Sequence, residues 1–174
     1  MSDVHDRRFL IRVAVVSSAE TLTQLNKLAP QPPWILGDPT QGSTSWLRER
    51  SGQLLGARQE ARIVAAFYPN SRLLLDEMAS ESQLRRLPAG ADVQIAAHMM
   101  RDPSDEQQSY IALGASTQDD GRLYTYEVQR LQGARALVVL RGCSSQRGAI
   151  VNGGALSMAR AWHKASAQQV LVSR

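Results

Sequence analysis

The chain has 174 residues, 43% of them hydrophobic and 21% charged, and carries a formal net charge of +4. This length is typical of one domain with enough apolar residues for a core, while the single cysteine excludes a disulfide framework and a cysteine-based zinc site. Because a chain without disulfides suits a reducing compartment, we expect a cytoplasmic protein. No apolar run reaches the length of a membrane span and the basic residues are scattered, so we expect neither a membrane nor a nucleic-acid partner.

The first half of the chain is predicted to alternate strands with helices. Strands are predicted over 8–16, 34–36 and 72–75, and helices over 19–28, 53–67 and 80–87. The helix over 53–67 has the clearest pattern, because its apolar residues recur at helical spacing and are offset from its charged residues.

The second half continues the alternation. Strands are predicted over 93–97, 109–113, 136–140 and 169–173, helices over 125–131 and 155–164, and a turn over 118–121. Thr125 is expected to cap its helix. The whole pattern predicts an α/β fold in which helices cover both faces of a mostly parallel sheet.

We expect a single domain over 1–174, in which 1–30 form an N-terminal strand–helix segment. The last predicted strand is apolar and stops at the end of the chain, at Arg174. This abrupt end indicates that the C-terminal part of the domain is missing.

Two of the predicted strands are followed by reactive side chains. Cys143 follows the apolar run Ala136 to Leu140, and His98 follows the apolar strand 93–97. Open α/β sheets place their chemistry at the carboxyl ends of parallel strands, so these two side chains can come together there. A thiol beside an imidazole is the pairing that nucleophilic cysteine catalysis requires.

The same residues have other interpretations. A lone cysteine after a strand is more often a small buried hydrophobe than a nucleophile, and a lone histidine is more often a hydrogen-bonded structural residue. A doubly wound domain that binds a small ligand at the switch point of its sheet would also fit the pattern. The residues taken one by one leave these alternatives open.

A series of segments then occurs in one order along 33–174. They are Trp34-Ile-Leu-Gly-Asp-Pro39, Leu55-Gly-Ala-Arg-Gln-Glu-Ala61, Val93-Gln-Ile-Ala-Ala-His98, Ser109-Tyr-Ile-Ala-Leu113, Asp120-Gly-Arg-Leu123 with Glu127 in the next helix, and Ala136-Leu-Val-Val-Leu140 with Cys143. In this order they resemble the CHAT domain, the caspase-like domain that is often fused to tetratricopeptide repeats in bacteria.

The resemblance implies a caspase-like α/β fold and a cysteine endopeptidase that uses no cofactor or metal. Cys143 would be the nucleophile and His98 the proton-transfer group, while the backbone amides of Cys143 and Met99 would bind the oxyanion. Arg141 and Ser109 would contact the substrate. The implied substrate is a protein or peptide in bacterial signalling or defence, with a tetratricopeptide-type or other regulatory partner.

The sequence departs from the family pattern on both sides of the expected site. Met99 stands where the family has glycine, and glycine permits backbone angles that are closed to methionine. Arg141-Gly142-Cys143 replaces the usual Ser-Ala-Cys, and we expect Arg141 to disfavour a basic substrate residue and to favour an acidic one. Because of Met99 and the abrupt end, a degenerate CHAT domain that binds proteins without cleaving them is the alternative function.

Overall fold

The computed structural model describes residues 10–13, 31–39, 55–133, 135–142 and 152–173. The strands are β1 (Leu10–Val13), β2 (Trp34–Gly37), β3 (Arg72–Leu75), β4 (Val93–Ala96), β5 (Met99–Met100), β6 (Tyr110–Ala112), β7 (Arg122–Tyr124), β8 (Arg135–Arg141) and β9 (Ala167–Ser173). The α-helices are α3 (Leu55–Phe67), α4 (Glu81–Leu84), α5 (Thr125–Val128) and α6 (Asn152–Lys164).

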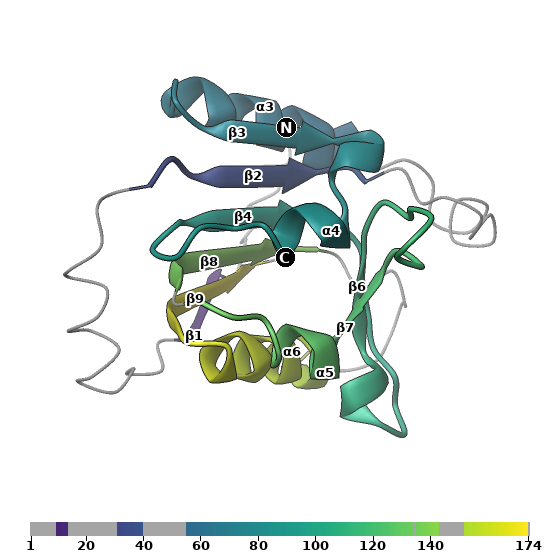
Figure 1. The fold of residues 1–174 in the computed structure, drawn as a ribbon. Coiled ribbons are helices and arrows are strands. Elements are labelled where there is room, and N and C mark those ends of the chain that lie inside the picture. Colours follow the sequence, from purple (N-terminus) through teal and green to yellow (C-terminus); the bar gives the residue numbers. More distant parts are fainter. Residues whose placement is uncertain (1–9, 14–30, 40–54, 134, 143–151, 174) are drawn as a thin grey trace, which may run out of the picture.

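Six of these strands form the main sheet, in the order β1-β9-β8-β4-β2-β3 (Figure 1). All neighbours pair in parallel except β1, which runs antiparallel to β9 at one edge. Parallel sheets need both faces covered, which is why the central strands are nearly continuous apolar runs. The prediction of a mostly parallel α/β sheet is confirmed.

Helices cover both faces of the main sheet. Helix α3 lies against one face over β2, β3 and β4, while α4, α5 and α6 lie on the opposite side (Figure 1). Gly37 lets α3 approach closely, since a Cβ atom there would lie only 2.5 Å from the Cβ of Ala61. The other face holds a continuous core in which Ile95 and Leu140 of the sheet join Met158 and Trp162 of α6.

A second, three-stranded antiparallel sheet follows β4, with the strand order β5-β6-β7. It stands beside the carboxyl ends of the main strands (Figure 1). The predicted strand over 109–113 is therefore confirmed as β6 but belongs to this sheet. The predicted turn over 118–121 is followed by a strand that was not predicted, β7, which begins at Arg122. Pairing with β6 decides this outcome, because three residues carry too little periodicity to indicate a strand.

The start of α5 differs from the prediction in its cap. Thr125 is the first residue of the helix, and its hydroxyl donates to the Ser109 carbonyl at 2.9 Å. The cap position belongs to Tyr124, whose backbone N–H donates to the Glu127 carboxylate at 3.0 Å. The prediction that Thr125 caps the helix is therefore wrong, because its hydroxyl is bonded to Ser109, the residue before β6.

At the ends of the chain the agreement is mixed. The predicted first strand is confirmed over Leu10–Val13, and the predicted helix over 19–28 lies outside the described residues. Helix α6 begins at Asn152, earlier than the expected residue 155. Within the described ranges, no helix combines the length and apolar character that a membrane span requires.

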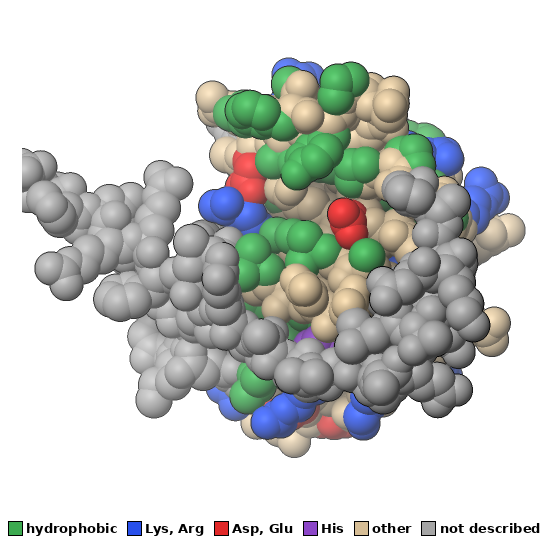
Figure 2. Space-filling model, turned by 90° about the vertical axis from the view of Figure 1, so that its left-hand side faces the viewer, with side chains coloured by type: hydrophobic (Ala, Val, Ile, Leu, Met, Phe, Trp, Pro, Cys, Tyr) green, Lys and Arg blue, Asp and Glu red, His purple; other side chains and the backbone are tan. Residues whose placement is uncertain are grey.

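Hydrophobic side chains are exposed along α3 and around β3. Figure 2 shows such side chains gathered at the top of the molecule, on the side where the main strands begin. The exposed large hydrophobic residues are Ile63, Phe67, Tyr68, Leu73 and Met78.

Candidate active site

Strands β4 and β8 are hydrogen-bonded neighbours in the middle of the main sheet. Val93 lies opposite Val138, and Ala96 lies opposite Arg141. One bond extends the ladder past the end of β4, where the Ala97 N–H donates to the Arg141 carbonyl at 3.0 Å. The two strands that precede His98 and Cys143 in sequence therefore end side by side at the same edge.

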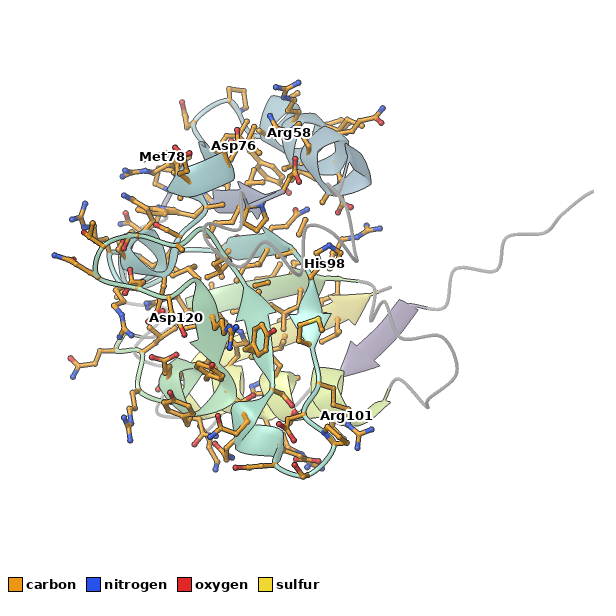
Figure 3. All side chains as sticks on the ribbon, turned by 90° about the vertical axis from the view of Figure 1, so that its right-hand side faces the viewer. Arg58, Asp76, Met78, His98, Arg101 and Asp120 are labelled. Carbon is orange, nitrogen blue, oxygen red and sulfur yellow. The ribbon has the colours of Figure 1, made fainter. Side chains whose placement is uncertain are left out.

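His98 lies between the two sheets (Figure 3). Its side chain is 5% exposed, and its carbonyl accepts a hydrogen bond from the Ala112 N–H at 2.8 Å. The residue before it is tied to the main sheet, as described above, so consecutive residues belong to different ladders. This arrangement fixes the backbone of His98 from both sides.

Met99 begins strand β5 and pairs with Ile111. Opposite residues of an antiparallel pair alternate between hydrogen-bonded and non-hydrogen-bonded positions. Because the Ala112 N–H donates to the His98 carbonyl, His98 and Ala112 are a hydrogen-bonded pair, and the next pair, Met99 and Ile111, is not hydrogen-bonded. The N–H of Met99 consequently points away from β6. Met99 lies in a strand and is not among the described residues with positive φ, so the backbone here does not require the glycine that the family has.

Gly142 packs directly against the segment that contains His98. A Cβ atom on Gly142 would lie 2.4 Å from the Ala97 carbonyl oxygen and 3.2 Å from Cε of Met99. Real Cβ atoms do not approach an oxygen so closely, so only glycine fits. The Met99 side chain thus fills the space beside the residue that precedes Cys143.

Arg141, the last residue of β8, is held by an ion pair to α3. Its Nε lies 2.9 Å from Oε1 of Glu60, and Gln94 of β4 donates to the same oxygen at 3.0 Å. The side chains of Arg141 and Glu60 are 35% and 24% exposed. The charge of Arg141 is therefore partly balanced within the chain.

Ser109 is buried, and its hydroxyl accepts a hydrogen bond from the Asp102 N–H at 3.1 Å. Its carbonyl binds both the N–H and the hydroxyl of Thr125. These bonds close the polar loop over 102–109. The expected contact of Ser109 with a substrate stays a prediction.

A charged cluster that sequence reasoning missed lies at the ends of β2 and β3. Asp38 follows β2 and Asp76 follows β3, both with positive φ, and both carboxylates bind Arg58 of α3. Nε of Arg58 lies 2.7 Å from Oδ2 of Asp38. The hydrogen bond to Asp38, and after it the one to Asp76, raise the pKa of Arg58. In Figure 3 Arg58 and Asp76 lie above His98 at the same side of the molecule.

Register explains why this cluster could not be predicted. In the parallel pair of β2 and β3, Gly37 lies opposite Leu75, so Asp38 and Asp76 follow at neighbouring strand ends. Only the order of the strands places the two carboxylates next to one another. The available signal was an aspartate within two residues of the end of each of two predicted strands.

Cys143 itself lies outside the described residues, and with it the predicted nucleophile and one of the two predicted oxyanion amides. The described part of the edge supplies a buried imidazole, an N–H group at Met99 that is not used by β6, and an arginine at the end of β8. An imidazole can transfer a proton, and backbone N–H groups can stabilise developing negative charge on an oxygen.

The sequence model of the CHAT domain family matches residues 1–174, the whole chain. The match extends the resemblance to the N-terminal segment, which includes β1. No curated protein matches the chain.

Proposed function

The chain belongs to the CHAT domain family, and on that basis we propose that it is a caspase-like cysteine endopeptidase domain that cleaves a protein partner through Cys143 and His98. The register between β4 and β8 is the observation that carries the proposal. Ala96 lies opposite Arg141, and the two catalytic residues each follow two positions later in the sequence.

The proposed reaction has two steps. The thiolate of Cys143 attacks the carbonyl carbon of the scissile peptide bond, and protonated His98 gives its proton to the departing amine. Water, deprotonated by His98, then attacks the thioester carbon and releases the carboxylic acid and the thiolate, which restores the starting pair of thiolate and protonated His98. The N–H groups of Met99 and Cys143 bind the oxygen that becomes negative in each step.

Arg141 and Ser109 complete the proposed site as substrate-binding residues. Arg141 is partly exposed at the end of β8, which supports direct contact with a substrate. Ser109 is buried and its hydroxyl accepts from the Asp102 N–H, which favours a role in ordering the loop over 102–109. We propose a cytoplasmic role in bacterial signalling or defence, with a tetratricopeptide-type or other regulatory partner.

The alternative is a CHAT domain that binds proteins without cleaving them. The specific observation in its favour is the Met99 side chain, which occupies the space beside Gly142. A bulky side chain beside the residue that precedes the proposed nucleophile can hinder the approach of a peptide.

The first test is the rate at which iodoacetamide alkylates Cys143 between pH 5 and 9. Since Cys143 is the only cysteine, the measurement reports one site. A neighbouring imidazolium stabilises the thiolate, so we expect a rate that stays high near pH 6 and falls in His98→Ala. His98→Asn is the second variant, because the asparagine amide retains polar groups at this buried position.

The alternative predicts a different pH profile. Alkylation that rises only near the ordinary thiol pKa of about 8.5, equally in wild type and both His98 variants, would exclude an activated thiol. Circular dichroism of each variant must match wild type, so that loss of the rate reports the dyad and not unfolding. Cleavage of peptide libraries by wild type, and none by Cys143→Ala, would then establish the peptidase.

A further inference from the structure

Two arginines at the carboxyl edge of the main sheet are held in the same way. Arg58 binds Asp38 through Nε at 2.7 Å, and Arg141 binds Glu60 through Nε at 2.9 Å. In both pairs the contact is made through Nε, and the guanidinium group carries further N–H donors on its two terminal nitrogens.

The two arginines differ in what lies at those terminal nitrogens. Nη2 of Arg58 binds a second carboxylate, that of Asp76. Among the described residues, Glu60 is the carboxylate that forms an ion pair with Arg141, and no second one does. Arg58 shows that a guanidinium group at this edge can hold two carboxylates at once.

The surroundings of Arg141 keep it in place for such a contact. Gln94 donates to the same oxygen of Glu60 that binds Arg141, at 3.0 Å, so Glu60 is itself oriented from β4. The Arg141 side chain is 35% exposed, so part of it is accessible to a ligand while its Nε is bound to Glu60. Partial burial also strengthens a charge-assisted hydrogen bond relative to one in bulk water.

We propose that the terminal nitrogens of Arg141 bind a carboxylate of the substrate, the side chain of an aspartate or glutamate close to the scissile bond. The inference rests on the proposed function, since Arg141 stands two residues before the proposed nucleophile and opposite Ala96. Glu60 and Gln94 are positioning residues, because they act on the substrate only through Arg141.

The test uses C-terminally amidated peptides in matched pairs, aspartate against asparagine and glutamate against glutamine, at each position around the scissile bond. At one position we expect kcat/KM to favour the acidic peptide about tenfold to a hundredfold, as hydrogen bonds to charged groups do. Arg141→Gln should abolish this ratio, so that the acidic and the amide peptide of each pair are cleaved with equal kcat/KM. Arg141→Lys should keep only part of it, because lysine lacks the planar fork.

Glu60→Gln tests the positioning role. We expect it to lower the acid-to-amide ratio, because Arg141 loses the carboxylate that orients it. The matched control is Arg62→Gln, which removes an exposed arginine two positions along the same helix and should leave the ratio unchanged. A peptide with a free C-terminal carboxylate and no acidic side chain separates the two sources of carboxylate, and preference for that peptide alone would overturn the side-chain assignment.

A binding arm separates this inference from the proposed function. Fluorescence anisotropy with labelled peptide pairs on Cys143→Ala measures discrimination without cleavage. If Cys143→Ala binds the acidic peptide more tightly in an Arg141-dependent way but wild type cleaves no peptide, the carboxylate site is supported and the peptidase is contradicted. If wild type cleaves peptides with no preference for the acidic member of a pair, the peptidase is supported and the carboxylate site is contradicted. If wild type cleaves no peptide and Cys143→Ala shows no preference, both are overturned.

Discussion

Gly142, which follows β8, and Met99, the first residue of β5, have complementary sizes at the candidate site. Gly142 has no room for a side chain because the Ala97 carbonyl lies where a Cβ atom would be, and the long Met99 side chain covers the space next to it. In the family pattern the small residue is on the histidine side and the larger one on the cysteine side. The two departures from that pattern are therefore linked by one packing contact.

A methyl group at residue 142 should be costly. We expect Gly142→Ala to lower the free energy of unfolding by about 1–3 kcal/mol, as overpacking does, and to slow alkylation of the next residue, Cys143. Urea unfolding measures the first effect. Gly56→Ala is the control: Gly56 is exposed in α3 with no atom within 4 Å of an added Cβ, so alanine should stabilise the helix by up to about 1 kcal/mol. Equal effects of the two substitutions would contradict the packing argument.

At the scale of single residues, the sequence predicted types of chemistry but not contacts. His98 at the end of an apolar strand was visible as a candidate, and so was Arg141 beside the expected site. The ion pair from Arg141 to Glu60 was not, because the two residues are far apart in sequence and meet only through the packing of α3 on β4 and β8.

Helix α3 organises the carboxyl edge of the sheet through two charged residues. Arg58 binds the carboxylates after β2 and β3, and Glu60 binds the arginine at the end of β8. One helix thus fixes residues at the ends of three parallel strands. The close contact between Gly37 and Ala61 sets the distance at which these side chains reach the edge.

Removing the charge of Arg58 should lower the stability of the chain, because the Asp38 carboxylate, 5% exposed, would lose the positive charge that Arg58 supplies. We expect Arg58→Gln to lower the urea concentration at the midpoint of unfolding and to increase the rate of proteolysis within α3. Arg62→Gln, one helical turn further and exposed, has no ion-pair partner among the described residues and should leave the midpoint nearly unchanged. Identical midpoints for both variants would show that the bridge adds no stability.

The elements that the sequence predicted well are those with a long regular pattern. The 13 residues of α3 carry a clear apolar face, and the central strands are apolar runs bounded by turns. The two-residue strand β5 and the three-residue strand β7 have no such pattern, and only their partner β6 makes them strands. The small sheet was therefore missed although its middle strand was predicted.

Across the whole molecule, burial makes stability depend on pH. Asp92 lies half-buried just before β4, and this burial raises its pKa, although a hydrogen bond from the Leu137 backbone opposes the shift. A carboxyl group whose pKa is higher in the folded chain binds more protons there than in the unfolded chain. This group therefore lowers stability as the pH rises from the unfolded value of about 3.9 through the folded value, and its penalty is complete above that.

Asp92→Asn removes this titration and keeps an oxygen that can accept from Leu137. We expect the variant to be more stable than wild type at pH 7, with a difference that shrinks to near zero as the pH approaches 4. Urea unfolding between pH 4 and 8 measures it. Glu77→Gln, at an exposed position, removes the same charge as a control and should show no such trend. A difference between Asp92→Asn and wild type that is constant over this range would exclude the burial effect.

The attachment of His98 to two sheets has a mechanical consequence. Ala97 is bonded to β8 of the main sheet, and the His98 carbonyl is bonded to β6 of the small one. Peptide planes are stiff, so only the backbone torsions of these two residues separate the ladders. A tilt of the small sheet relative to the main sheet would therefore change the backbone torsions on either side of His98, and with them the orientation of its imidazole relative to β8.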